Sequence, residues 1–434
     1  MRHVSTTALA LLCLLAAMQS AWGVERFPRP QFETSYTNPV TTVPPAARAS
    51  GLRPAVDIVV LAVALALAAH LALRARSRRG LLLLTMASIL YFGFWRRGCV
   101  CSVGSVQNMV LALSDRGYAV PLVVVAFFLL PLVFTLFHGR TFCAAVCPLG
   151  GVQDLMVLKP VRLPAWLSHA LGLVPYVVLG LAILLAVTGC GFLVCRYDPF
   201  VAIFRFSGHP GVLAFGAGLL VLGTVVARPY CRFLCPYGVL LSWLSRLARR
   251  HVTVTPDECI LCRLCEQSCP FDAIRFPTAA AGGEHVRRGV RRLAILLALL
   301  PILMACGGWL GSRLEVPLSR LHPTIQLAEL VRAQELGGAE ASPETQTFAA
   351  SGTAPQTLYD EALAARRRLA VGGWLFGGFV GLVVGAKLIT LSVRRTFADY
   401  APDRGNCLSC GRCFAWCPRE HVRLEAKGEG RAAA

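Results

Sequence analysis

The sequence predicts an all-α protein that crosses a membrane several times, from its composition and from a series of long apolar segments. Hydrophobic residues make up 56% of the 434 positions and charged residues only 15%, a balance that is untypical of a soluble protein of this length. The net charge of +20 does not indicate nucleic-acid binding. Its basic residues stand in short groups beside apolar segments, and no nucleic-acid-reading motif accompanies them.

Residues 1–23 have the features of a secretory signal peptide. Arg2 and His3 precede an apolar stretch, and Ala21-Trp22-Gly23 offers a small-x-small cleavage site. Residues 24–54 are rich in Pro, Thr and Ala. We expect them to form a periplasmic linker without a hydrophobic core.

Seven further apolar segments approach the ~20 residues that a helix needs to cross a bilayer. They lie at about 55–73, 81–95, 118–137, 171–188, 211–227, 293–310 and 371–391. Counted from an outer start, most arginine groups fall in cytoplasmic segments, although Arg96, Arg97 and Arg366 to Arg368 do not. The segment 81–95 would span only about 22 Å as a helix, so we expect the loop at Cys99 to lie below the outer surface.

The membrane core, residues 55–250, contains an internal repeat that is marked by cysteines. One unit runs from an outer Cys-x-Cys pair to an inner Cys-x3-Cys-Pro motif, and the second runs from an outer Cys-x4-Cys pair to the same inner motif. Two such hairpins, paired about a pseudo-twofold axis, would gather four cysteines at each face. The outer set is Cys99, Cys101, Cys190 and Cys195, and the inner set is Cys143, Cys147, Cys231 and Cys235.

The most specific motif is a run of four cysteines that occurs twice. Each run has the spacing Cys-x2-Cys-x2-Cys-x3-Cys-Pro of bacterial ferredoxins, in which the first three cysteines hold one [4Fe–4S] cluster and the fourth ligates the other. We therefore expect Cys259, Cys262, Cys265 and Cys417 around one cluster, and Cys407, Cys410, Cys413 and Cys269 around the second. Zinc also uses Cys-x2-Cys pairs, but two complete runs with matching prolines favour iron–sulfur clusters.

These runs define the remaining domains. Residues 251–285 and 393–434 are expected to form the two halves of a split α+β ferredoxin domain on the cytoplasmic side. Between them we expect a transmembrane helix over 286–310, a periplasmic loop over 311–368 and a second transmembrane helix over 369–392.

The two four-cysteine sets of the membrane core permit more than one interpretation. The inner set could hold a third cluster at the cytoplasmic boundary or consist of reduced structural thiols. The outer set could hold a further cluster or form disulfides, which an oxidising periplasm favours. Cysteines one residue apart rarely bond to each other, so any disulfide would join the two loops.

The paired Cys-x3-Cys-Pro motifs on membrane hairpins, followed by a ferredoxin run, resemble the membrane polyferredoxins of the NapH and NosR type. The resemblance covers about residues 81–275. It implies that the chain passes electrons from quinol or a cytoplasmic donor to a periplasmic reductase system. Three features depart from that pattern: the displaced second ferredoxin run, the outer cysteines, and the absence of a recognisable large flavin-binding domain.

The sequence thus predicts electron transfer through iron–sulfur clusters across a bacterial inner membrane. The expected partners are membrane lipid, other redox subunits, a periplasmic acceptor and a cytoplasmic or quinol donor, without nucleic acid. No acid–base or nucleophile–base pair indicates a self-contained enzyme. Arg232 and Arg263 stand beside cysteines and are expected to raise cluster potentials. A redox sensor or metalloenzyme assembly factor, and a zinc or disulfide scaffold, stay open as alternatives.

Overall fold

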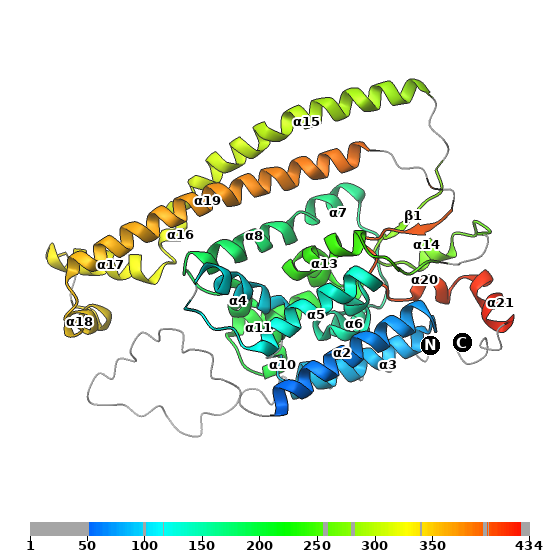
Figure 1. Cartoon of the computed structure of the whole chain (residues 1–434), viewed down its shortest axis with the longest axis horizontal. Coiled ribbons are helices and arrows are strands. Elements are labelled where there is room, and N and C mark those ends of the chain that lie inside the picture. Colours follow the sequence, from blue (N-terminus) through cyan, green and yellow to red (C-terminus); the bar gives the residue numbers. More distant parts are fainter. Residues whose placement is uncertain are drawn as a thin grey trace.

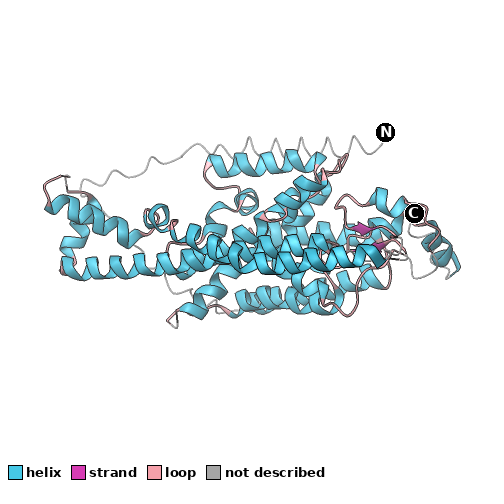
Figure 2. Ribbon diagram, turned by 90° about the horizontal axis from the view of Figure 1, so that it is seen from above, coloured by secondary structure: helices cyan, strands magenta, loops and turns pink. Residues whose placement is uncertain are grey.

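The computed structural model describes residues 52–98, 101–115, 117–254, 259–278, 283–338, 341–393, 397 and 399–426. The expected signal peptide, nearly all of the expected linker, and Cys99 lie outside these residues. The described part is mostly helical, with two short strands at one end (Figure 2).

The elements of the membrane core come first along the chain, and those of the ferredoxin halves and of the helices between them follow (Figure 1). The core comprises α2 (Leu52–Leu73), α3 (Arg78–Ser88), the π-helix η1 (Ile89–Trp95), α4 (Ser102–Ser114), α5 (Leu122–His138), the π-helix η2 (Phe142–Val146), α6 (Pro148–Met156), α7 (Ala165–Leu171), α8 (Val174–Val187), α9 (Leu193–Tyr197), α10 (Pro199–Arg205), α11 (Pro210–Val225), α12 (Pro229–Phe233) and α13 (Pro236–Arg246). The later elements are α14 (Leu264–Ser268), β1 (Ile274–Arg275), α15 (Gly283–Ser312), α16 (Glu315–Ser319), α17 (Pro323–Glu335), α18 (Pro343–Ala350), α19 (Pro355–Ser392), β2 (Ala401–Pro402), α20 (Arg412–Ala415) and α21 (Pro418–Ala426).

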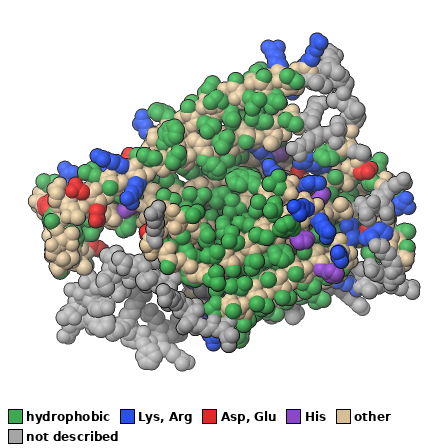
Figure 3. All heavy atoms as spheres, in the orientation of Figure 1, with side chains coloured by type: hydrophobic (Ala, Val, Ile, Leu, Met, Phe, Trp, Pro, Cys, Tyr) green, Lys and Arg blue, Asp and Glu red, His purple; other side chains and the backbone are tan. Residues whose placement is uncertain are grey.

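Four helical stretches of the described chain are long and apolar enough to cross a membrane: Arg53–Leu73, Ala165–Val187, Arg287–Ser312 and Pro355–Ser392. A fifth arises if α10 and α11, which meet at 105°, count as one broken span. The expected segments 81–95 and 118–137 correspond to α3–η1, which changes from α- to π-helix, and to α5, which has 17 residues. Figure 3 shows apolar side chains over the middle of the molecule, with charged side chains gathered towards its two ends.

The core helices pack around one continuous apolar core that includes Leu61, Phe127, Phe142 and Tyr237 and extends to cysteines of the ferredoxin runs. A second apolar core, which we call the outer core, joins the end of α8 to α16, α17 and α19. It contains Ile325 and Leu369, and Cys190 packs against it. The protein therefore has two packed regions that share α8.

α15 and α19 run side by side as a long hairpin (Figure 1). Glycines spaced four apart line the contact, because a Cβ there would collide with the backbone of the facing helix. Gly307 and Gly311 meet Gly373 and Gly377 in this way. Such stripes of small residues are typical of helices that associate within a membrane.

The two ferredoxin halves form one unit although the hairpin separates them in the sequence. β1 pairs antiparallel with β2, with Ile274 opposite Pro402 and Arg275 opposite Ala401. The Arg275 side chain also forms an ion pair with Asp403. The two halves therefore lie together at one end of the molecule, with α14 from the first half and α20 and α21 from the second (Figure 1).

Candidate metal centres

The first candidate centre is a cavity that combines three cysteines of the first run with the last cysteine of the second. It encloses about 310 Å³ of empty space. Apart from the cysteines, Tyr400, Arg263 and apolar side chains contribute to its wall. The cysteines that line it are Cys259, Cys262, Cys265 and Cys417.

The second centre is built in the same way from the other four cysteines. Its cavity of about 340 Å³ is lined by Phe271, Arg412 and several apolar residues in addition to the thiols. The cysteines that line it are Cys407, Cys410, Cys413 and Cys269. The two groupings are those that the ferredoxin spacing predicts, with the fourth cysteine of each run in the other centre.

The backbone of the two runs explains why their thiols converge. Leu261 and Arg263 in the first run have positive φ angles of 53° and 66°, and Ser409 and Gly411 at the matching positions of the second have 53° and 79°. Left-handed backbone is unusual for residues other than glycine. Two such residues between the cysteines curl each loop around its cavity.

The spacing of the thiols fits a [4Fe–4S] group better than one metal ion. A tetrahedral zinc ion holds its sulfurs at about 2.3 Å and so brings them within about 3.8 Å of one another. Among the described residues, no three His, Cys, Asp or Glu side chains lie close enough to hold a single ion. Four thiols instead surround an open space in each centre, as the ligands of a four-iron group must.

The Cys-x3-Cys-Pro motifs have matching local structures. Cys147 and Cys235 each precede a helix, α6 and α13, whose first residue is the proline. Their backbone angles agree closely, with φ and ψ of −72° and 114° against −69° and 111°. A proline is well placed there because the first helical N–H has no intrahelical partner. The two motifs thus share one backbone conformation at the second cysteine and its proline, whereas Cys143 lies in the π-helix η2 and Cys231 in the α-helix α12.

The structure brings the four inner cysteines together in the membrane core. Cys147 lies within electrostatic range of Cys143, Cys231 and Cys235. The amide of Gln153 donates to the Cys231 sulfur at 3.4 Å. All four side chains are buried or half-buried. This group, the inner quartet, is suited to bind a further cluster.

Two arginines beside the inner quartet were missed in the sequence analysis. Arg140 and Arg228 each stand three residues before the first cysteine of a Cys-x3-Cys-Pro motif, and both are almost completely buried. Arg140 lies 3.8 Å from the Cys143 sulfur, and Arg228 donates to the Cys143 carbonyl at 2.5 Å. Extending the comparison of the two repeats three residues upstream would have revealed them.

The four outer cysteines are placed less uniformly. Cys101 lies within electrostatic range of Cys195, whereas Cys190 packs against the outer core and accepts a hydrogen bond from Thr188. None of these three cysteines forms a disulfide in the described part of the chain, and Cys99 lies outside it. Cys101 also shares a largely apolar cavity of about 420 Å³ with Cys147 of the inner quartet.

The two arginines that were expected beside clusters differ from each other. Arg263 lines the Cys259 cavity and donates to the Tyr400 hydroxyl at 3.3 Å. Arg232 instead forms an ion pair with Asp272 at 3.0 Å and donates to Ser168. Arg263 therefore lies next to a candidate cluster site and could raise its potential, whereas the Arg232 side chain is held by Asp272.

Comparison with known proteins agrees with this geometry. A family model described as "4Fe-4S binding domain" matches residues 120–173 and 208–255, which contain the two Cys-x3-Cys-Pro motifs, and another of the same description matches residues 252–275. An uncharacterized protein of Methanocaldococcus jannaschii is 30% identical over 191 residues, which are 42% of this chain and 77% of that protein. The chain belongs to the ferredoxin-type 4Fe-4S membrane proteins. Their chemistry is electron transport through iron–sulfur clusters.

In other relatives of this ferredoxin-type protein, the match covers less than half of the relative's own length. The putative electron transport protein YccM of Escherichia coli is 27% identical over 35% of this chain and 46% of its own length. The regulatory protein NosR of Pseudomonas aeruginosa is 27% identical over 46% of this chain and 30% of its own length. The matched region is therefore less than half of either relative. No solved structure matches the chain.

Proposed function

We propose that this ferredoxin-type protein carries electrons across a membrane, between a donor at its ferredoxin end and an acceptor at the opposite face. The observation that carries the proposal is the order of the thiol sites. The Cys259 cavity is lined by the exposed Cys262. The Cys407 cavity lies next to the membrane core, whose arginines contact its loops. The inner quartet follows within the membrane core. The cavity shared by Cys147 and Cys101 continues this series.

The proposed topology places the ferredoxin domain in the cytoplasm of a bacterial cell, with seven spans after a signal peptide. The correspondence of each apolar segment with a helix supports this number, including the short α3–η1 and α5. Helices shorter than ~20 residues bring groups at the two faces closer together than a full bilayer. The positive-inside distribution of arginine supports the orientation.

We propose three [4Fe–4S] clusters: two in the ferredoxin domain and one in the inner quartet. Each would supply a group that gains or loses one electron without a large rearrangement. The side chains of this protein hold the thiolates, exclude water and set the local charge. Cys190 packs against the outer core, so a fourth cluster on the outer cysteines is the weaker proposal.

The partners follow from the two ends of the series. A cytoplasmic donor would approach the exposed Cys262 loop, whose neighbours Ile260 and Leu261 are more than half exposed. Quinol could instead supply electrons from the bilayer. A periplasmic redox protein would be the acceptor. The name of YccM, a putative electron transport protein, supports a role in electron transport.

Iron and acid-labile sulfide per chain, measured with EPR on anaerobically purified protein, test the cofactor content. About twelve iron atoms are expected, since each cluster holds four. The double variant Cys147→Ser/Cys235→Ser should retain about eight. About eight in the unmodified protein would contradict the inner cluster and favour a redox sensor or assembly factor.

The double variant Cys99→Ser/Cys101→Ser tests the outer cysteines in the same assay. It should leave the iron content unchanged if only three clusters are bound. About sixteen iron atoms in the unmodified protein, falling to about twelve in this variant, would establish an outer cluster.

A further inference from the structure

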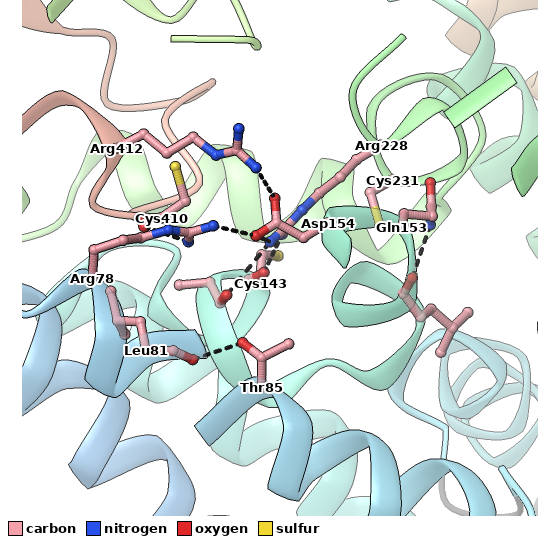
Figure 4. A network of polar contacts seen from close by, with 12 residues as sticks. Arg78, Leu81, Thr85, Cys143, Gln153, Asp154, Arg228, Cys231, Cys410 and Arg412 are labelled. Carbon is pink, nitrogen blue, oxygen red and sulfur yellow. Dashed lines mark hydrogen bonds and ion pairs between the residues drawn. The ribbon is translucent and has the colours of Figure 1, made fainter. Parts of the chain in front are cut away.

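A buried carboxylate, that of Asp154, lies between the ferredoxin domain and the membrane core. Asp154, in α6, is only 4% exposed and forms ion pairs with three arginines (Figure 4). Its oxygens lie 2.7 Å from Arg78, 3.4 Å from Arg228 and 3.2 Å from Arg412. The three guanidinium groups come from α3, from the residue before α12, and from α20, which are far apart in the sequence.

Each of these arginines also contacts a cysteine loop. Arg78 donates to the Cys410 carbonyl at 2.8 Å, and Arg412 lines the Cys407 cavity. Arg228 donates to the Cys143 carbonyl at 2.5 Å. Asp154 therefore connects a ligand loop of the Cys407 centre to a ligand loop of the inner quartet.

Two further contacts join the same two sites. The guanidinium of Arg140 donates to the Gly405 carbonyl at 3.1 Å and lies 3.8 Å from the Cys143 sulfur. The guanidinium of Arg228 also lies 5.7 Å from the ring centre of Phe271, which lines the Cys407 cavity. The Cys259 centre meets the membrane core through other contacts. Glu266 pairs with Arg162, whose side chain is 49% exposed, and the buried Glu420, three residues after Cys417, pairs with Arg76.

The charges explain why Asp154 is needed in this position. Three guanidinium groups converge on one carboxylate, and neither Arg228 nor Asp154 is reached by water. Removing the carboxylate would leave buried positive charges without a partner and close to each other, a strongly unfavourable arrangement. The Cys410 loop, which carries Arg412 and accepts a hydrogen bond from Arg78, would then shift relative to the membrane core.

We propose that Asp154 is a positioning residue for electron transfer, which holds the Cys407 centre against the inner quartet and makes that centre the donor to the membrane core. The proposal rests on the function proposed above. In the step itself, a cluster held by the Cys407 centre would lose one electron and be oxidised, and a cluster held by the inner quartet would gain it and be reduced. No bond forms or breaks, and no proton is required.

The test is EPR spectroscopy of the full-length, cluster-loaded protein. Two reduced clusters held close together broaden each other's signals, so unmodified protein should show an interaction between the Cys407 centre and the inner quartet. In Asp154→Asn this interaction should be lost while the iron content stays unchanged. Asp154→Glu should restore part of it. An Asp154→Asn variant with full iron and the unmodified interaction would overturn the proposal.

Two further variants keep the test decisive. Glu266→Gln is the matched control, because it also removes a carboxylate paired with an arginine, but beside the Cys259 centre; its EPR interaction should be unchanged. If Asp154→Asn loses iron, Arg412→Gln replaces it, since this arginine side chain is 23% exposed and is one of three partners. With full iron, a weakened interaction supports the proposal and an unchanged one overturns it.

Iron analysis distinguishes this proposal from the proposed function. About eight iron atoms in the unmodified protein would remove the inner cluster and with it the proposed function. About twelve iron atoms, together with an EPR interaction that does not change in Asp154→Asn, would contradict only the positioning role of Asp154.

Discussion

The two ferredoxin runs have the same spacing and the same left-handed backbone positions but lie in very different surroundings. The first run exposes Cys262 and its neighbours Ile260 and Leu261 to solvent. In the second run, Cys410, Cys413 and Cys417 are buried, and arginines of the membrane core contact its loops. The same ligating motif therefore forms one centre that is open to solvent and one that lies against the membrane core.

The largest expected effect tests the exchange of cysteines between the runs. Cys269→Ser should remove the buried Cys407 cluster, although Cys269 belongs to the exposed run, and Cys417→Ser should remove the exposed cluster. Each variant should lose about four iron atoms and a different EPR signal. Loss of the exposed cluster's signal in Cys269→Ser would show that each run binds its own cluster.

A large effect on stability is expected on the buried side. Arg228→Gln removes one partner of an ion pair in which neither side chain is exposed, and breaking such a pair costs about 3 kcal/mol or more. Thermal unfolding in detergent should therefore begin at a clearly lower temperature. Arg162→Gln, at the exposed ion pair beside the other run, is the control and should change stability by less than about 1 kcal/mol.

The pairing of the two runs should depend on pH at its acidic end. Burial acts to raise the pKa of Asp403, but the hydrogen bonds and charge of Arg275 and two backbone N–H groups outweigh it and lower this pKa. A lowered pKa in the folded state stabilises the protein above the unfolded value of about 3.9, and this contribution is lost as the pH falls through the folded value.

Stability measured between about pH 5 and pH 2 should therefore fall less in Asp403→Asn than in the unmodified protein. The variant should be the less stable of the two at neutral pH, since it lacks the ion pair with Arg275. Parallel curves for the two proteins would show that Asp403 does not link the runs in this way.

The smallest effect is expected on the exposed side. Arg263 lines the Cys259 cavity but is open to solvent, which screens its charge. Arg263→Gln should lower the midpoint potential of the exposed cluster slightly and leave the buried cluster unchanged in a redox titration. Arg412→Gln should lower the potential of the buried cluster more. If the midpoint potential shifted equally in both variants, burial would not explain a difference between the two centres.

Much of this organisation could be predicted from the sequence because it depends on local spacing. The ferredoxin runs fix which thiols share a cavity, and the repeated Cys-x3-Cys-Pro motif indicates two related hairpins. The apolar segments each correspond to a helix, although α3–η1 and α5 are too short or too irregular to stand out as full spans.

The remaining features depend on contacts between distant segments. Asp154 is one acidic residue of the short helix α6, and nothing in its sequence neighbourhood indicates that Arg78, Arg228 and Arg412 converge on it. The outer cysteines illustrate the same difficulty. Their symmetrical spacing predicts one group of four, but Cys190 packs against the outer core, which only the later helices α16, α17 and α19 complete.

Electron transfer through the inner quartet is the central claim, and vesicles test it most directly. The purified protein would be placed in lipid vesicles that enclose a membrane-impermeant electron acceptor, with an impermeant reductant added to the ferredoxin side. The acceptor should be reduced by the unmodified protein and not by Cys147→Ser/Cys235→Ser, which retains the ferredoxin clusters. Equal reduction by both proteins would contradict the claim.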